Sequence, residues 1–150
     1  MQQLIYAMQF TGRAVPGEGS SDVLMASTSA PSCTITSLVG SEGLAGMVSS
    51  AAGGTAAFES TVTFTGEESF LESGSIAFGS DGHLLCFSTV GQGYLGPAAD
   101  GLRHGAITWR VDGGNGQFAE ARGLITSNFL VGADGAVTDN HLGVIYVDEH

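Results

Sequence analysis

The chain has 150 residues, 43% of them hydrophobic, so it is long enough for one domain with its own core (residues 1–150) and too apolar for a disordered segment. Its 15 acidic residues face only 4 basic ones, all arginine, and the formal net charge is −11. This charge disfavours nucleic acids and anionic membranes as partners, because their phosphates are bound by basic side chains.

Nine strands are expected in chain order, because short runs of β-branched and aromatic residues alternate with glycine-rich turns. The expected strands span residues 2–13, 22–28, 33–39, 55–65, 69–78, 83–90, 104–111, 121–131 and 136–147. The pair 22–28 and 33–39 has the weakest pattern. Residues 40–54, rich in Gly, Ala and Ser, form either a mobile flap or a plain connection. One helical turn is expected, at residues 117–121.

Short glycine-containing loops between successive strands predict hairpins, and consecutive hairpins make an antiparallel meander. Closing such a meander removes its exposed edges. The expected fold class is therefore all-β, an eight-stranded antiparallel closed barrel with little helix. A barrel of this size has an interior that can hold one small ligand.

Pairing across the loop at residues 66–68 places one acidic residue among aromatic side chains. Phe64 falls opposite Phe70, Val62 opposite Glu72 and Phe58 opposite Ile76, and residues two apart share a face. A carboxyl among aromatic rings is desolvated, which raises its pKa and suits a general acid or base. The alternative is that Glu72 lies in water near a barrel mouth, or pairs with an arginine.

Further candidates follow from the neighbouring strands. The hairpin across residues 79–82 adds His83 to the face of Glu72, and Arg110 is the candidate to neutralise Glu72 or to hold a substrate oxygen. The connection at residues 91–103 is expected to close the pocket near Tyr94. The candidate catalytic residues are Glu72, Arg110 and His83, and the candidate substrate-binding residues are Phe58, Phe70, Phe87, Tyr94 and Trp109.

The last predicted hairpin carries a second polar cluster. Pairing across residues 132–135 sets Asn128 opposite Asp139 and Thr126 opposite His141. If the face of Glu72 lines the lumen, Asn128, Asp139 and His141 are surface or interface residues. If the other face does, they lie together inside a pocket. The histidines lack the spacing of metal ligands, so no metal site is expected.

A family resemblance rests on the stretch from Val111 to Gly123, whose sequence is VDGGNGQFAEARG. It resembles the V-x-GG-x-G-x-F-x-x-A-x-G hairpin of plant dirigent proteins and, more loosely, the GG-x-G-x-F turn of allene oxide cyclases. The resemblance covers residues 83–147. It implies an eight-stranded antiparallel barrel that handles apolar small molecules without a cofactor.

The same glycines also fit the skeleton of a dinucleotide-binding loop, which needs a long helix after it. Gly123 would end such a helix within two turns, and residues 124–131 are rich in strand-forming types. We therefore expect a broad hairpin, in which Gly114 and Gly116 supply positive φ and Phe118 plugs the barrel end.

The sequence thus predicts a cofactor-free barrel enzyme of the cyclase or isomerase type, acting on an apolar small molecule. Such an enzyme holds a flexible substrate in a reactive conformation and moves a proton with one or two polar groups. The alternative is a non-catalytic carrier for a hydrophobic metabolite. Because the start of the chain does not resemble a signal peptide, a cytoplasmic location is expected. Because only 13% of the residues are charged, we expect a homo-oligomer, a dimer or trimer.

Overall fold

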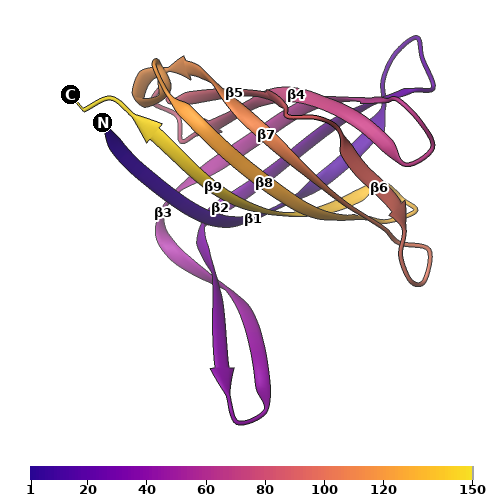
Figure 1. Cartoon of the computed structure of the whole chain (residues 1–150), viewed down its shortest axis with the longest axis horizontal. Helices are drawn as coiled ribbons and strands as arrows, with labels where there is room; N and C mark the ends of the chain where they lie inside the picture. The colour runs from indigo at the N-terminus through magenta and orange to yellow at the C-terminus, as the bar shows by residue number, and fades with distance from the viewer. Residues whose placement is uncertain (150) are drawn as a thin grey trace.

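The computed structural model describes residues 1–149 and consists almost entirely of strands (Figure 1). The elements are β1 (Gln2–Pro16), β2 (Val23–Gly40), β3 (Gly43–Phe64), β4 (Ser69–Phe78), β5 (Leu84–Thr89), β6 (Gly93–Pro97), β7 (Arg103–Asn115), a 3-10 turn η1 (Gly116–Phe118), β8 (Arg122–Val131) and β9 (Ala136–Val147). Residues 1–149 contain no helix with the length and hydrophobicity of a membrane span. The all-β prediction is confirmed.

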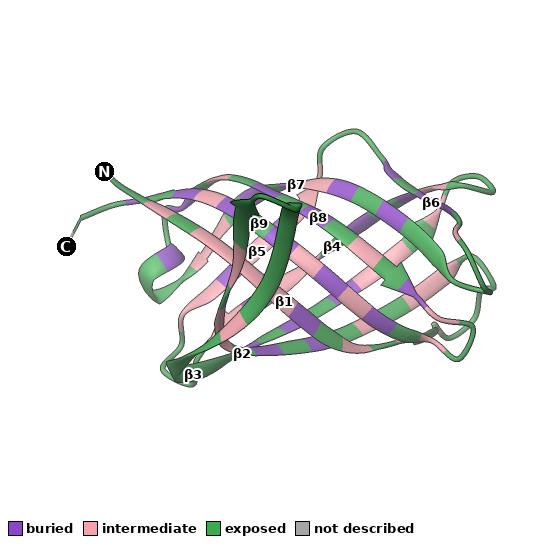
Figure 2. Cartoon of the chain, turned by 90° about the horizontal axis from the view of Figure 1, so that it is seen from below, coloured by how far each residue is buried: buried purple, intermediate pink, exposed green. Residues whose placement is uncertain are grey.

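Eight of these strands form a closed antiparallel ring. Its order is β3-β2-β1-β9-β8-β7-β5-β4, and the pairing of β4 with β3 closes it. The short strand β6 pairs with β4 and β7. It lies within the predicted connection at residues 91–103, which therefore contains an additional strand. Where the strands form the ring, successive side chains alternate between its interior and its outer face, as the alternating colours of Figure 2 show.

The predicted pairing of β3 with β4 is confirmed in every position, including Phe64 with Phe70 and Val62 with Glu72. Aromatic rings fill the middle of the interior. The ring centroid of Phe58 lies 5.4 Å from those of Phe87 and Trp109. Much of the interior is therefore solid core.

The predicted pairing of β8 with β9 is wrong by one residue. Val131 pairs with Val137, so the loop is one residue longer than expected, and Asn128 faces Asn140 instead of Asp139. A one-residue change of register moves every side chain of a strand to the other face of the sheet. As a result Asp139 and His141 point into the interior and are buried, whereas Asn128 is exposed on the outside.

Residues 40–54 are neither a flap nor a plain connection. The predicted strands 22–28 and 33–39 are one continuous strand, β2, with a bulge between Pro31 and Cys33. Beyond this bulge the far half of β2 pairs only with the first half of β3, and the two form an arm (residues 33–50) that projects from the ring (Figures 1 and 2). The arm exposes apolar side chains, among them Val39 and Leu44.

The glycine-rich stretch at residues 113–116 forms the predicted turn. Gly114 and Gly116 have φ values of +154° and +61°, and Phe118 is buried against Phe78 at 5.3 Å between ring centroids. A Cβ atom on Gly114 would overlap the carbonyl oxygen of Leu84. Both the backbone conformation and the close approach therefore require glycine there.

We expect Gly114→Val to destabilise the protein by at least about 2 kcal/mol, because the β-branched residue adds both backbone strain and a clash. Chemical denaturation measures the loss. Gly40→Val is the matched control, since no atom lies within 4 Å of its added Cβ and its φ is ordinary. Equal midpoints for the two variants would contradict the role assigned to Gly114.

Candidate functional site

A small cavity of about 50 Å³ lies inside the ring. It is close to the end formed by the β1–β2, β3–β4 and β8–β9 loops, since residues next to each loop line it. Its lining consists of Ala14, Leu24, Ala26, Thr28, Phe58, Val62, Phe70, Glu72, Leu95, Phe129, Val131, Val137 and Asp139. Three of these side chains are polar, Thr28, Glu72 and Asp139, and none is basic. The cavity is therefore apolar with two carboxyl groups and one hydroxyl.

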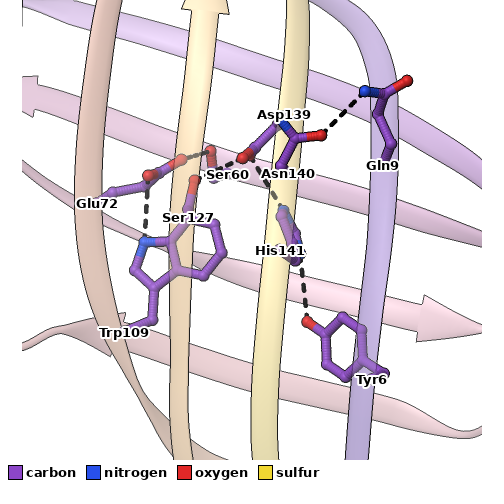
Figure 3. A network of polar contacts seen from close by, with 9 residues as sticks. All are labelled: Tyr6, Gln9, Ser60, Glu72, Trp109, Ser127, Asp139, Asn140 and His141. Atoms are coloured by element: carbon purple, nitrogen blue, oxygen red, sulfur yellow. Dashed lines mark hydrogen bonds and ion pairs between the residues drawn. The ribbon is translucent and has the colours of Figure 1, made fainter. Parts of the chain in front are cut away.

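Glu72 of β4 accepts hydrogen bonds from side chains on two other strands, the adjacent β3 and the more distant β7 (Figure 3). Ser60 of β3 donates a hydrogen bond of 2.5 Å to Oε2, and Trp109 Nε1 of β7 donates one of 3.2 Å to Oε1. The side chain is only 8% exposed. Burial raises the pKa of Glu72 to about 7 and the charge of Asp139 adds to the rise, whereas the hydrogen bonds from Ser60 and Trp109 oppose it. Glu72 can therefore hold or release a proton near neutral pH.

Asp139 belongs to a second series of polar contacts, which links it to side chains of β8, β9 and β1. Ser127 donates a hydrogen bond of 2.5 Å to Oδ1, and His141 Nε2 lies 3.1 Å from Oδ2. The hydroxyl of Tyr6 lies 3.2 Å from His141 Nδ1. Burial, followed by the nearby charge of Asp139, raises the pKa of Tyr6 above its usual range. A protonated Tyr6 hydroxyl can donate to Nδ1, and in that tautomer His141 carries a proton on Nε2 and donates it to Asp139.

The two carboxyl groups line the same cavity from opposite sides of the ring, Glu72 on β4 and Asp139 on β9 (Figure 3). Their surroundings differ. Glu72 accepts from two neutral donors beside aromatic rings, whereas Asp139 accepts from a serine and an imidazole. Two neighbouring carboxyls with different environments suit one proton donor and one proton acceptor.

Thr28 of β2 is the third polar group of the cavity. Its side chain is only 5% exposed, and its Oγ1 has no hydrogen-bond partner among the residues that the structure describes. A buried hydroxyl without a partner is rare, because it loses its hydrogen bonds to water without replacement.

The sequence-predicted site residues fall into three groups in the structure. Glu72, Phe58 and Phe70 line the cavity. Phe87 and Trp109 lie behind it in the aromatic core and contact each other at 4.5 Å between ring centroids. Of the second predicted cluster, Asp139 lines the cavity and His141 contacts Asp139. The other predicted residues, Arg110, His83, Tyr94 and Asn128, do not line it.

The structure contradicts the role predicted for Arg110, and neither His83 nor Tyr94 lines this cavity. Arg110 is exposed on the outer face, where its Nε lies 3.6 Å from Asp112, so it cannot neutralise Glu72. His83 lies at the start of the β5 region, and its Nδ1 accepts a hydrogen bond of 3.0 Å from the Gln117 amide in the glycine-rich turn. Tyr94 is 45% exposed, and its neighbour Leu95 lines the cavity instead.

The placement of Asn128 in a polar cluster with Asp139 and His141 is also wrong, because of the register change between β8 and β9. Three buried polar residues, Thr28, Ser60 and Ser127, and the half-buried Tyr6 were not predicted. Strand alternation could have indicated Ser60, since it lies between Phe58 and Val62 on the same face. Alternation with Phe10 on β1 could likewise have indicated Tyr6, whereas the inward residues beside Thr28 on β2 are small or aliphatic and mark no site.

Among residues 1–149, no three His, Cys, Asp or Glu side chains form a group that could hold a metal ion. No protein-family model, curated protein or solved structure matches this chain. The chemistry of the cavity is therefore the ground for a functional proposal, and its two carboxyl groups are the central observation.

Proposed function

We propose that the protein is a cofactor-free isomerase that moves a proton on a small, mainly apolar molecule bound inside the ring. The observation that carries this proposal is the pair Glu72 and Asp139 on one apolar cavity. In such a site, an ionised carboxylate takes a proton from carbon while a protonated carboxyl donates to the substrate oxygen.

The proposed step starts with Asp139 ionised and Glu72 protonated. Asp139 removes a proton from the carbon next to a carbonyl group, and Glu72 gives its proton to the carbonyl oxygen, which yields a neutral enol. If the substrate has a carbon–carbon double bond next to that carbon, the enol is a conjugated dienol. Asp139 then returns the proton to the far end of the dienol and Glu72 takes back the proton of the enol oxygen, which restores the carbonyl and both carboxyl groups and shifts the double bond. Burial favours this arrangement, because it keeps Glu72 protonated up to a pH of about 7.

The size of the cavity limits the substrate. Its volume of about 50 Å³ is a third of the roughly 150 Å³ that holds a benzene ring in an apolar protein cavity. A whole molecule with six heavy atoms, cyclic or not, exceeds this volume, so only the carbonyl end of a slender chain can lie beside the carboxyls while the rest extends out of the cavity. This favours an isomerase over a ring-closing cyclase.

Deuterium exchange tests the proposal. We expect the protein to speed the uptake of deuterium from heavy water into 2-pentanone, and Glu72→Gln to slow the catalysed exchange by roughly 10²- to 10⁴-fold, the usual contribution of one general acid or base. The exposed Arg110→Gln variant is the control and should exchange as fast as wild type. An unchanged rate in Glu72→Gln would refute the catalytic role of Glu72.

The second candidate function is a carrier for a hydrophobic metabolite. Apart from its three polar groups, the cavity lining is apolar, which suits simple binding. The chain has a single tryptophan, and Trp109 donates to Glu72, so its fluorescence reports on cavity occupation. A ligand-dependent change in that fluorescence without deuterium exchange by the wild-type protein would favour the carrier.

Membership of the allene oxide cyclase and dirigent-like barrel superfamily is part of the same proposal. The closed ring of eight antiparallel strands and the turn at residues 113–116 support it. A cytoplasmic location and a hydrophobic small-molecule partner likewise remain predictions.

We further propose a homo-oligomer, a dimer or trimer. The neighbouring strands β1, β8 and β9 carry no acidic side chain on their outer faces, and Ile5, Leu124 and Leu142 are each more than half exposed there, at 66%, 52% and 51%. An apolar wall of this kind marks an interface between chains. Sedimentation should give two or three times the chain mass of 15.2 kDa, and Leu142→Glu should reduce it. A wild-type monomer at micromolar concentration would contradict this prediction.

A further inference from the structure

We propose that Thr28 anchors the ligand in the cavity, and that it binds the oxygen of a neutral, unbranched ketone or aldehyde. The inference rests on the proposed function in taking the same cavity as the site. It adds a binding residue and the chemical class of the ligand.

The hydroxyl of Thr28 is free to bind a ligand. It is nine-tenths buried, it lines the cavity, and its Oγ1 has no partner among the described residues. Each of the other polar groups of the cavity is satisfied within the protein, Glu72 by two donors and Asp139 by two. The unpaired hydroxyl is therefore the group whose hydrogen bond a ligand can complete.

The lining of the cavity determines the charge of the ligand that it can bind. No arginine or histidine lines the cavity, and two carboxyl groups do. A carboxylate or phosphate would be repelled by these groups and would lose its hydration without compensation. An ammonium group could pair only with Asp139, whose oxygens already accept from Ser127 and His141, because burial opposes ionisation of Glu72. The ligand that fits is neutral.

The hydrogen-bond donors of the cavity determine which ligand atom they bind. The Thr28 hydroxyl and a protonated Glu72 can both donate toward the cavity, so a ligand atom that binds both groups is an acceptor. A carbonyl oxygen has two lone pairs and can accept from both. The small volume then requires that the carbonyl lies near the end of a slender chain.

Binding of 2-pentanone to Thr28→Val, followed by Trp109 fluorescence, tests the inference. Valine has nearly the same shape but no hydroxyl, so we expect affinity for 2-pentanone to fall roughly five- to tenfold, the effect of one lost hydrogen bond. Affinity for 1-pentene, which has no oxygen, should not fall. Thr28→Ser should restore ketone binding.

A second readout separates this role from a structural one. Ligand-free Thr28→Val should melt at the same temperature as wild type or higher, because it removes an unpaired buried hydroxyl. Weaker ketone binding together with undiminished stability is the expected combination. Equal ketone affinity in wild type and Thr28→Val would overturn the inference, as would tighter binding of pentanoate or pentylamine than of 2-pentanone.

The outcomes also separate the inference from the proposed function. If ketone binding needs Thr28 but Glu72→Gln exchanges deuterium as fast as wild type, the isomerase proposal fails and the binding role of Thr28 stands. If Glu72→Gln loses exchange while Thr28→Val binds the ketone normally, the isomerase proposal stands and the inference fails.

Discussion

Glu72→Gln should change the free energy of unfolding, relative to wild type, more favourably at pH 8 than at pH 5, by about 2–3 kcal/mol. The pKa of Glu72 rises from 4.5 in the unfolded chain to about 7 in the folded protein. The folded state therefore binds this proton more tightly, and the associated stability is fully present below pH 4.5 and lost as the pH rises to 7. Glutamine cannot ionise, so the variant avoids that loss.

Thermal melting of wild type and Glu72→Gln at pH 5 and pH 8 measures the effect. We expect the melting temperature of the variant, relative to wild type, to be roughly 5–10 °C higher at pH 8 than at pH 5. Both values avoid the isoelectric point near 4.3, where solubility is lowest. Glu59→Gln, an exposed carboxyl on β3, is the control and should show the same difference from wild type at both pH values. Parallel curves for wild type and Glu72→Gln would show that Glu72 is not desolvated in the folded state.

Phe58→Ala should have the largest effect on stability, a loss of roughly 3–5 kcal/mol. Phe58 is 2% exposed. Its ring lies between those of Phe10, Phe87 and Trp109, at centroid distances of 6.3, 5.4 and 5.4 Å. Truncation removes these aromatic contacts and leaves a void that a closed ring of strands cannot collapse to fill.

Chemical denaturation measures the loss, and Trp109 fluorescence should shift in the native variant because one wall of its site is gone. Leu44→Ala on the arm is the control. Leu44 is 77% exposed, so its truncation should change stability by less than about 0.5 kcal/mol. A loss below about 1.5 kcal/mol in Phe58→Ala would mean that the aromatic core is less tightly packed than described.

Local patterns predicted a large part of the fold and one half of the site. The strand boundaries of β4 and β9 agree with the sequence, and the short loop at residues 66–68 sets the pairing of β3 with β4. The predicted hairpin therefore placed Glu72 among phenylalanines, because strand alternation and loop length depend only on residues close together in the sequence. Of the arm at residues 33–50, only the strand at residues 33–39 was predicted, because the Gly, Ser and Ala composition of residues 40–50 has no apolar alternation.

The other half of the site depended on the tertiary structure. A loop one residue longer than expected turned Asp139 and His141 inward and Asn128 outward, which the local sequence of β8 and β9 did not distinguish. Whether the face of Glu72 and the face of Asp139 point to the same space depends on closing the ring, and the contact that joins distant parts of the chain is the pairing of β1 with β9. Sequence alone determined which residues share a face of a hairpin. Ring closure decided which faces meet, because that choice is made by burying apolar faces from distant strands together.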